Sequence, residues 1–114
     1  MQRSDRIRIQ HMLDAAREAL SFTADKARTD LDTNRMLALS LVKSIEIIGE
    51  AASRVSIKSR AEITIIPWSD IVAMRNRLIH AYFEINLDIL WQTVTYELPS
   101  LVAELERVLS SSDT

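Results

Sequence analysis

The sequence predicts an all-α protein: an up-and-down bundle of about four helices, with room for an extra short helix and a kink in the C-terminal helix. Two observations support this prediction. The chain of 114 residues contains one glycine and two prolines, which leaves little material for hairpins and tight turns. Apolar residues also recur at intervals of three and four nearly throughout, which is the spacing of amphipathic helices.

The first two long helices are each predicted by an apolar stripe. The first stripe consists of Ile9, Met12, Leu13, Ala16 and Leu20. The second consists of Leu37, Leu41, Ile45, Ile48, Ala52 and Val55. Asp30, Asp32 or Thr33 is expected to cap the start of this second helix, because short polar side chains accept hydrogen bonds from the first free backbone amides.

Prolines and a polar cap define the later helices. Pro67 suits the first turn of a helix that is expected to run from Trp68 to Ala81 or Tyr82. Asn86 is the expected N-cap of the last helix, which Pro99 should kink or split because proline lacks a backbone N–H. Residues 57–66 are expected to form a short helix or an apolar loop. Residues 1–109 then make one helical domain, and residues 110–114 a disordered tail.

Charge and composition narrow the possible functions. Fourteen Lys and Arg against sixteen Asp and Glu give a formal charge of −2, which argues against a broad basic surface for nucleic acid but leaves room for a small positive cleft. The chain has no cysteine, and neither a signal peptide nor a membrane span is recognisable. We therefore expect a cytoplasmic protein without membrane association.

The run Arg75-Asn76-Arg77-Leu78-Ile79-His80-Ala81-Tyr82 concentrates the polar chemistry of the chain. Arginine offers a fork of donors suited to phosphate oxygens, and histidine exchanges protons near neutral pH. On an ideal helix Asn76 and His80 lie about 40° apart and share a face, whereas Arg75 and His80 lie about 140° apart. Either the helix ends or bends near His80, or two subunits contribute the two groups across a two-fold axis. The plainer alternative is a solvated arginine beside a hydrogen-bonded histidine and a half-buried tyrosine.

Three blocks carry a resemblance to a known family: residues 45–52 (Ile-Glu-Ile-Ile-Gly-Glu-Ala-Ala), Pro67-Trp68, and residues 74–83 around the motif. In order and spacing they resemble a HEPN domain, and within that superfamily the HepT-like toxins of HEPN/MNT type VII toxin–antitoxin modules. The family pattern is an arginine, commonly followed by asparagine, then a histidine and a tyrosine, here Arg75, Asn76, His80 and Tyr82. Many relatives have glycine where this chain has Ala81.

The resemblance implies a homodimeric, metal-independent endoribonuclease that needs no cofactor and cleaves RNA by attack of its 2′-hydroxyl. Arg75 and His80 would be catalytic, and Asn76 would support them. The implied partner is a nucleotidyltransferase antitoxin of the MNT type, which would neutralise the toxin by adenylylating Tyr82. The alternative is a non-catalytic HEPN module that binds a nucleotidyltransferase or a nucleotide.

Further residues are interpreted more simply. Gly49, in the middle of a helix, indicates close approach of a neighbouring helix. Glu46 and Glu50 lie one turn apart, but without a Glu-x-x-His pattern they do not predict a di-metal site, and Glu50 could pair with a motif arginine. The arginines at positions 3, 6 and 8 are assigned to a solvated face, with contact to RNA as the alternative.

Overall fold

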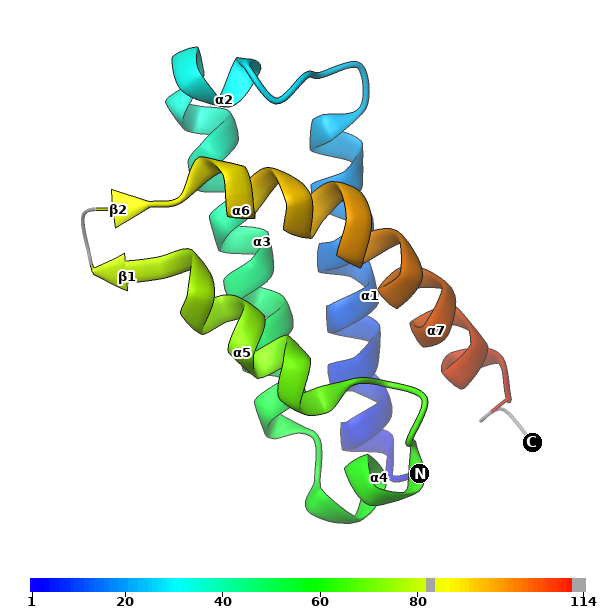
Figure 1. Cartoon of the computed structure of the whole chain (residues 1–114). Helices are drawn as coiled ribbons and strands as arrows, with labels where there is room; N and C mark the ends of the chain where they lie inside the picture. The colour runs from blue at the N-terminus through cyan, green and yellow to red at the C-terminus, as the bar shows by residue number, and fades with distance from the viewer. Residues whose placement is uncertain (82–83, 112–114) are drawn as a thin grey trace.

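The computed structural model confirms an all-α bundle with one short β-ribbon (Figure 1). The structure describes residues 1–81 and 84–111, and for residues 79–81 and 84 it describes the backbone alone. The elements are α1 (Arg3–Thr23), α2 (Asp30–Thr33), α3 (Arg35–Arg54), α4 (Ile57–Glu62), α5 (Trp68–Leu78), β1 (Ile79–Ala81), β2 (Glu84–Ile85), α6 (Leu87–Gln92), a π-helical turn (Thr93–Glu97) and α7 (Leu98–Ser111).

Helices α1 and α3 lie side by side and form the centre of the bundle (Figure 1). Helix α5 packs mainly on α3, and the segment from α6 to α7 crosses α1. The predicted four-helix arrangement is therefore confirmed, with α2 and α4 as short additions between the long helices. No helix in the described part of the chain is both long enough and apolar enough to cross a membrane.

The apolar stripes that predicted the helices form the core. All members of the second stripe are buried, Val55 directly after the end of α3 and the others on it, and α1 buries its own stripe except for Leu20, which is partly exposed. Burying a large aliphatic side chain contributes roughly 1.5–3 kcal/mol, so these contacts account for much of the stability of the bundle. The largest side chains that are almost fully buried include Ile9, Met12, Leu41, Ile45, Ile48, Leu90, Leu98 and Leu105.

The prediction for the motif helix is wrong at its C-terminal end. Helix α5 ends at Leu78, and the chain continues as β1, which pairs antiparallel with β2. Ile79 lies opposite Ile85, and Ala81 opposite Glu84. Backbone hydrogen bonds that a longer helix would have formed along its axis are thus made across a ribbon. The connecting residues 82 and 83 lie outside the described residues.

The predicted cap of α3 is also wrong, whereas that of α6 is confirmed. Residues 30–33 form the separate helix α2, and the Asn34 side chain accepts a hydrogen bond from the backbone N–H of Leu37 at 3.0 Å. Asn86 accepts one from the N–H of Ile89 at 3.0 Å, as predicted. Residues 57–62 form α4, which confirms the expected short helix in that region.

A π-helical turn divides the C-terminal helix, as the predicted kink or split required, next to Pro99. Pro99 lies in the first turn of α7, directly after the π-helical turn Thr93–Glu97. A wider turn at this point accommodates a residue that has no N–H for the helical hydrogen-bond ladder. Helix α7 continues through Ser110 and Ser111, where a disordered tail was expected, and residues 112–114 lie outside the described residues.

A buried carboxylate ties the start of α1 to α4. Asp5 is only 3% exposed. It accepts hydrogen bonds from the Ser56 N–H at 2.9 Å and from the hydroxyls of Ser56 and Ser59 at 2.6 Å each. Burial opposes ionisation of Asp5, but the hydrogen bonds from Ser56 and Ser59 outweigh it and lower the pKa of the carboxyl group below its ordinary value.

Candidate functional site

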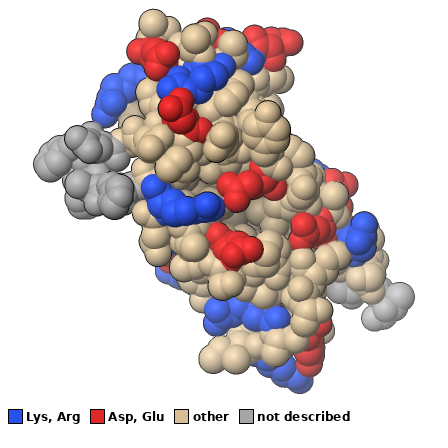
Figure 2. All heavy atoms as spheres, viewed as in Figure 1, with Lys and Arg blue, Asp and Glu red and all other residues tan. Residues whose placement is uncertain are grey.

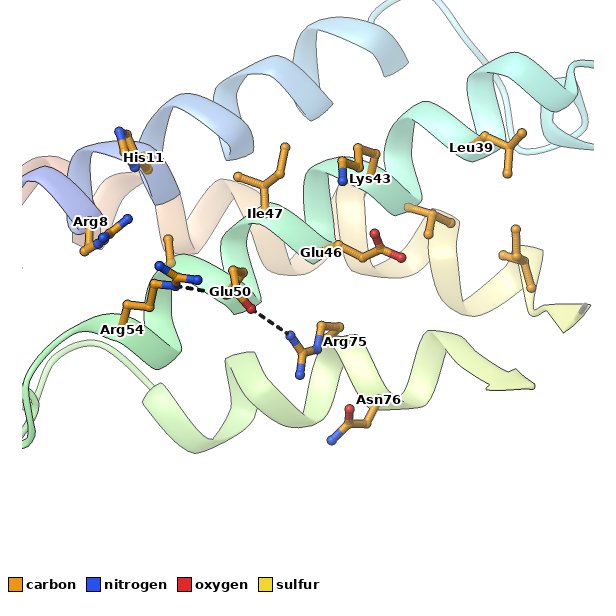
Figure 3. A pocket seen from close by; sticks show the side chains of 13 residues that line it. Arg8, His11, Leu39, Lys43, Glu46, Ile47, Glu50, Arg54, Arg75 and Asn76 are labelled. Carbon is orange, nitrogen blue, oxygen red and sulfur yellow. Dashed lines mark hydrogen bonds and ion pairs between the residues drawn. The ribbon is translucent and has the colours of Figure 1, made fainter. Parts of the chain in front are cut away.

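Arg75 extends from α5 across the surface of α3 (Figure 3). A β-carbon at Gly49 on α3 would lie 3.2 Å from Cδ and 3.4 Å from Cβ of Arg75. The absence of a side chain at Gly49 therefore allows the arginine to lie against the helix, which confirms the close approach predicted from this glycine. The guanidinium is held there by an ion pair, because Arg75 Nη1 lies 3.7 Å from Glu50 Oε2.

Glu50 joins two arginines. Its Oε1 accepts a hydrogen bond from Arg54 Nε at 2.9 Å, while its other oxygen faces Arg75. The pairing of Glu50 with a motif arginine was one alternative left open by the sequence, and the contact with Arg54 was not predicted. All three side chains are more than a third exposed, so each ion pair stabilises the fold by at most about 1 kcal/mol. The arrangement orients Arg75 without fixing it rigidly.

These residues line a cleft of about 1070 Å³, which we call the α1–α3–α5 cleft. Arg75 and Asn76 come from α5, Arg8 and His11 from α1, and the remaining polar lining residues Lys43, Glu46, Glu50 and Arg54 from α3. In Figure 3 Arg8, His11 and Arg54 gather toward one end of the cleft, and Lys43 and Glu46 lie further along α3. The cleft is thus bordered by charged groups from three helices that are remote in sequence.

Asn76 lies at the junction of two surface hollows. It projects from α5 on a different side from Arg75 (Figure 3). Besides the α1–α3–α5 cleft, a second groove of about 1030 Å³ runs past α2 and α6, and the two share Asn76 and Ile85. An exposed amide here can donate to and accept from a ligand in either hollow.

The other two motif residues are only partly located. The backbone of His80 lies in β1, two residues beyond the end of α5, so the helical angles expected between it and Arg75 or Asn76 do not apply. Of the two explanations for the Arg75–His80 separation, the structure shows the first: the helix ends before the histidine. The side chain of His80 and the whole of Tyr82 lie outside the described residues.

Sequence reasoning missed part of this cleft. His11 was not identified, although its spacing of three from Arg8 places both on one side of α1. Arg8 itself was assigned to a solvated face. No group of three or more His, Asp or Glu side chains that could hold a metal ion occurs in the described part of the chain. Glu46 and Glu50 accordingly have no further metal ligand among the described residues.

The face of the molecule in Figure 2 carries acidic and basic side chains interspersed, without a single broad basic patch. On this face, therefore, neither sign of charge forms a continuous surface. A small all-α bundle with a motif arginine directed into a charged cleft is the class of protein that the fold and the site define.

Comparison with known proteins identifies the family. A family model described as "Ribonuclease HepT-like" matches residues 12–108, and the chain belongs to this HepT-like family. Relatives include "Putative RNase MJ1380" of Methanocaldococcus jannaschii, 33% identical over 85% of this chain and 89% of the relative. "Probable ribonuclease HepT" of Thermococcus cleftensis is 30% identical over 95% of this chain and 98% of the relative.

One relative has about twice the length of this chain. "Gamma-glutamylcyclotransferase and putative RNase MJ0434" of M. jannaschii is 30% identical over 99% of this chain, which spans only 51% of that relative. No solved structure matches the chain significantly. The family assignment thus rests on sequence, over nearly the whole length of the bundle.

Proposed function

We propose that this chain is an RNA-cleaving toxin that acts as a metal-independent endoribonuclease. The observation that carries the proposal is the placement of Arg75, which lies over Gly49 and points into a charged cleft, in a chain of the HepT-like family. A guanidinium in such a position can stabilise the charge that develops on a phosphodiester as it is attacked. The names of the relatives, which mention RNase or ribonuclease, support the same activity.

RNA carries its own nucleophile, so the reaction needs no metal-activated water. The 2′-oxygen bonds to phosphorus, the bond from phosphorus to the 5′-oxygen breaks, and Arg75 stabilises the phosphorane between these events. His80 takes the proton of the 2′-hydroxyl or gives one to the leaving 5′-oxygen. Asn76 orients the phosphate or His80. The products are a 2′,3′-cyclic phosphate and a 5′-hydroxyl, and DNA resists cleavage because it lacks the nucleophile.

We further propose that the active form is a homodimer. One histidine cannot readily act as base and acid in the same transfer step, whereas a two-fold axis would bring two histidines and two arginines to one site. Activity in the cytoplasm, on cellular RNA, fits this role.

Control by a partner is the second half of the proposal. A nucleotidyltransferase antitoxin transfers AMP from ATP to the phenol oxygen of Tyr82, with release of pyrophosphate. The added phosphate brings negative charge and bulk to the position that the RNA phosphate must occupy. Co-expression with the antitoxin should add multiples of the AMP mass to Tyr82, and a neutralised but unmodified toxin would indicate inhibition by occlusion instead.

The deciding experiment is cleavage of total RNA in EDTA by the purified protein, with Arg75→Ala and His80→Ala beside it. We expect cleavage by the wild type and none by either variant. Arg77→Ala is the matched control, because Arg77 lies on the same helix but points to Glu97, 3.4 Å away, and should retain activity. A dimeric, unmodified wild type without activity would favour the non-catalytic module that binds a nucleotidyltransferase.

A further inference from the structure

The α1–α3–α5 cleft differs in charge from the protein as a whole. Its lining contains four cationic side chains and two carboxylates, a formal charge of +2, whereas the chain carries −2. The cations are Arg8, Lys43, Arg54 and Arg75, and the carboxylates are Glu46 and Glu50. The cleft is therefore positive although the whole chain is slightly acidic, and it would attract a polyanion.

The carboxylate of Glu50 marks a position for an anion. It lies between two guanidinium groups, 2.9 Å from Nε of Arg54 and 3.7 Å from Nη1 of Arg75. The three side chains are largely solvated, so a phosphate can compete for the same donors at little cost. Guanidinium donors suited to an anion thus extend along α3 from Arg75 to Arg54, away from the motif.

Beyond Arg54, α1 adds two side chains at the same end of the cleft (Figure 3). Arg8 is half-buried and His11 is exposed, and they stand about one helical turn apart. Within the described part of the chain, the side chains of Arg8, His11 and Lys43 form no ion pair or hydrogen bond. Their donors are therefore available to a ligand.

The cleft is also apolar between its charges. Ile47 and Leu39 of α3 are 37% and 45% exposed, and both line it. Alternating cations and exposed apolar side chains suit a single strand, whose phosphates need donors and whose unpaired bases need apolar contact. Double-stranded nucleic acid would present only its backbone to such a surface.

We propose that the α1–α3–α5 cleft binds single-stranded RNA beyond the scissile phosphate, with Arg8 and His11 as substrate-binding residues. This inference rests on the proposed ribonuclease function and assigns the path of its substrate. The strand passes from Arg75, where it is cut, across Glu50 and Arg54 to α1. Arg8 binds a backbone phosphate, and His11 binds the next phosphate or the face of a base. Neither residue takes part in the cleavage step.

The test measures binding alone. A fluorescent RNA of about eight nucleotides, a length within the range that single-strand binding sites cover, carries 2′-O-methyl groups so that it cannot be cleaved. Its anisotropy is titrated with wild type, Arg8→Ala, His11→Ala and Arg17→Ala. Arg17 is the matched control, since it is also on α1 but pairs with Glu106 at 3.5 Å and lies about 180° around the helix from Arg8.

We expect Arg8→Ala and His11→Ala to weaken binding several-fold, while Arg17→Ala binds like wild type. Loss of one phosphate contact should also reduce the slope of log affinity against log salt concentration by about 0.7 for Arg8→Ala. Unchanged affinity and slope in both variants, or no binding by the wild type, would overturn the proposal. A protein that binds this RNA but cleaves no natural RNA would refute the proposed function alone.

A second copy of the chain is the competing occupant of the cleft. The mass of each variant is therefore measured by light scattering under the conditions of the titration. An unchanged mass with weakened RNA binding supports the proposal. If Arg8→Ala lowers the mass, and RNA affinity returns at concentrations that restore the larger species, the cleft is a subunit interface and the proposal is wrong.

Discussion

Gly49 and Arg75 face each other across the α3–α5 interface: a β-carbon at Gly49 would lie 3.2 Å from Cδ of the arginine. The chain has one glycine, and it stands where the motif arginine crosses the neighbouring helix. A glycine inside a helix costs about 1 kcal/mol relative to alanine. We infer that this cost is accepted because a side chain here would press against Arg75 and shift it.

Gly49→Ala should separate stability from activity. The unfolding free energy is expected to rise by up to about 1 kcal/mol, because α3 gains a better helix former and the partly exposed Arg75 side chain can shift by a few tenths of an ångström. Cleavage should fall several-fold, since even a small shift of the guanidinium changes its alignment with the phosphate. Thermal unfolding and cleavage rates measure the two effects. Gly49→Leu should lose both stability and cleavage activity. A fully active Gly49→Ala would show that the position of Arg75 is not critical.

Glu50→Gln should affect binding and catalysis in opposite directions. Removal of the carboxylate raises the charge of the cleft by one and frees Arg54, so the KM for RNA should fall at low salt. Arg75 also loses the partner that orients it, so kcat should fall. Steady-state kinetics at two salt concentrations would separate these effects.

The matched control for Glu50→Gln is Glu62→Gln, because Glu62 is an exposed residue at the end of α4, outside the cleft. If KM fell by the same factor in Glu50→Gln and Glu62→Gln, the cause would be the charge of the whole protein and not the position of Glu50.

Much of the fold and part of the site could be predicted from the sequence. The spacing of apolar residues is a local property of each helix, so the stripes on α1 and α3 correctly predicted the core. Gly49 and Glu50 were correctly linked to close packing and to a motif arginine, because an unfavourable glycine and a neighbouring carboxylate are visible in the sequence itself.

The predictions that were wrong concern features that depend on tertiary contacts, which cannot be recognised in the sequence. The end of α5 at Leu78 is set by pairing of β1 with β2, and no glycine or asparagine turn signals that ribbon. Asn34 competes as a cap with three polar residues just before it, and only the geometry of α2 decides between them. His11 lines the cleft because α1 and α5 both pack against α3, and this packing depends on tertiary structure that the local sequence does not indicate.

The two asparagine caps should contribute comparably to stability. Asn34→Ala and Asn86→Ala each remove a side-chain acceptor that lies 3.0 Å from a backbone N–H in the first turn of a helix. Each should lower the unfolding free energy by about 0.5–2 kcal/mol, whereas Asn→Asp at either position should preserve the cap. Chemical denaturation measures the change. If Thr33→Ala were as damaging as Asn34→Ala, the capping role of Asn34 would be in doubt.

The proposed dimer predicts a mass in solution. Size-exclusion chromatography with light scattering should give about twice the chain mass of 13.0 kDa. If the reaction uses a histidine from each subunit, dimers of one wild-type and one His80→Ala subunit should cleave far more slowly than wild type, because each holds a single intact histidine. A strict monomer that cleaves RNA would refute the shared site.

Asp5 should govern the acid sensitivity of the bundle. Burial works against its charged form, but hydrogen bonds from Ser56 and Ser59 dominate and lower its pKa in the folded state. Below the ordinary pKa of an aspartate, the unfolded state therefore binds the proton more readily than the folded state does. The stabilising contribution of Asp5 is complete above pH of about 5, and is lost as the pH falls through the lowered pKa.

Asp5→Asn tests this directly. The amide cannot accept all three hydrogen bonds that the carboxylate receives, so at neutral pH the variant should be less stable by about 1–3 kcal/mol. Its stability should also depend less on pH than that of the wild type between about pH 5 and pH 2, so that the two curves converge in acid. Chemical denaturation at several pH values measures both effects. Asp14→Asn is the control, because Asp14 is an exposed carboxylate on the same helix that accepts a hydrogen bond from Gln10 at 2.9 Å. Parallel curves for wild type and Asp5→Asn would mean that other carboxylates cause the acid transition.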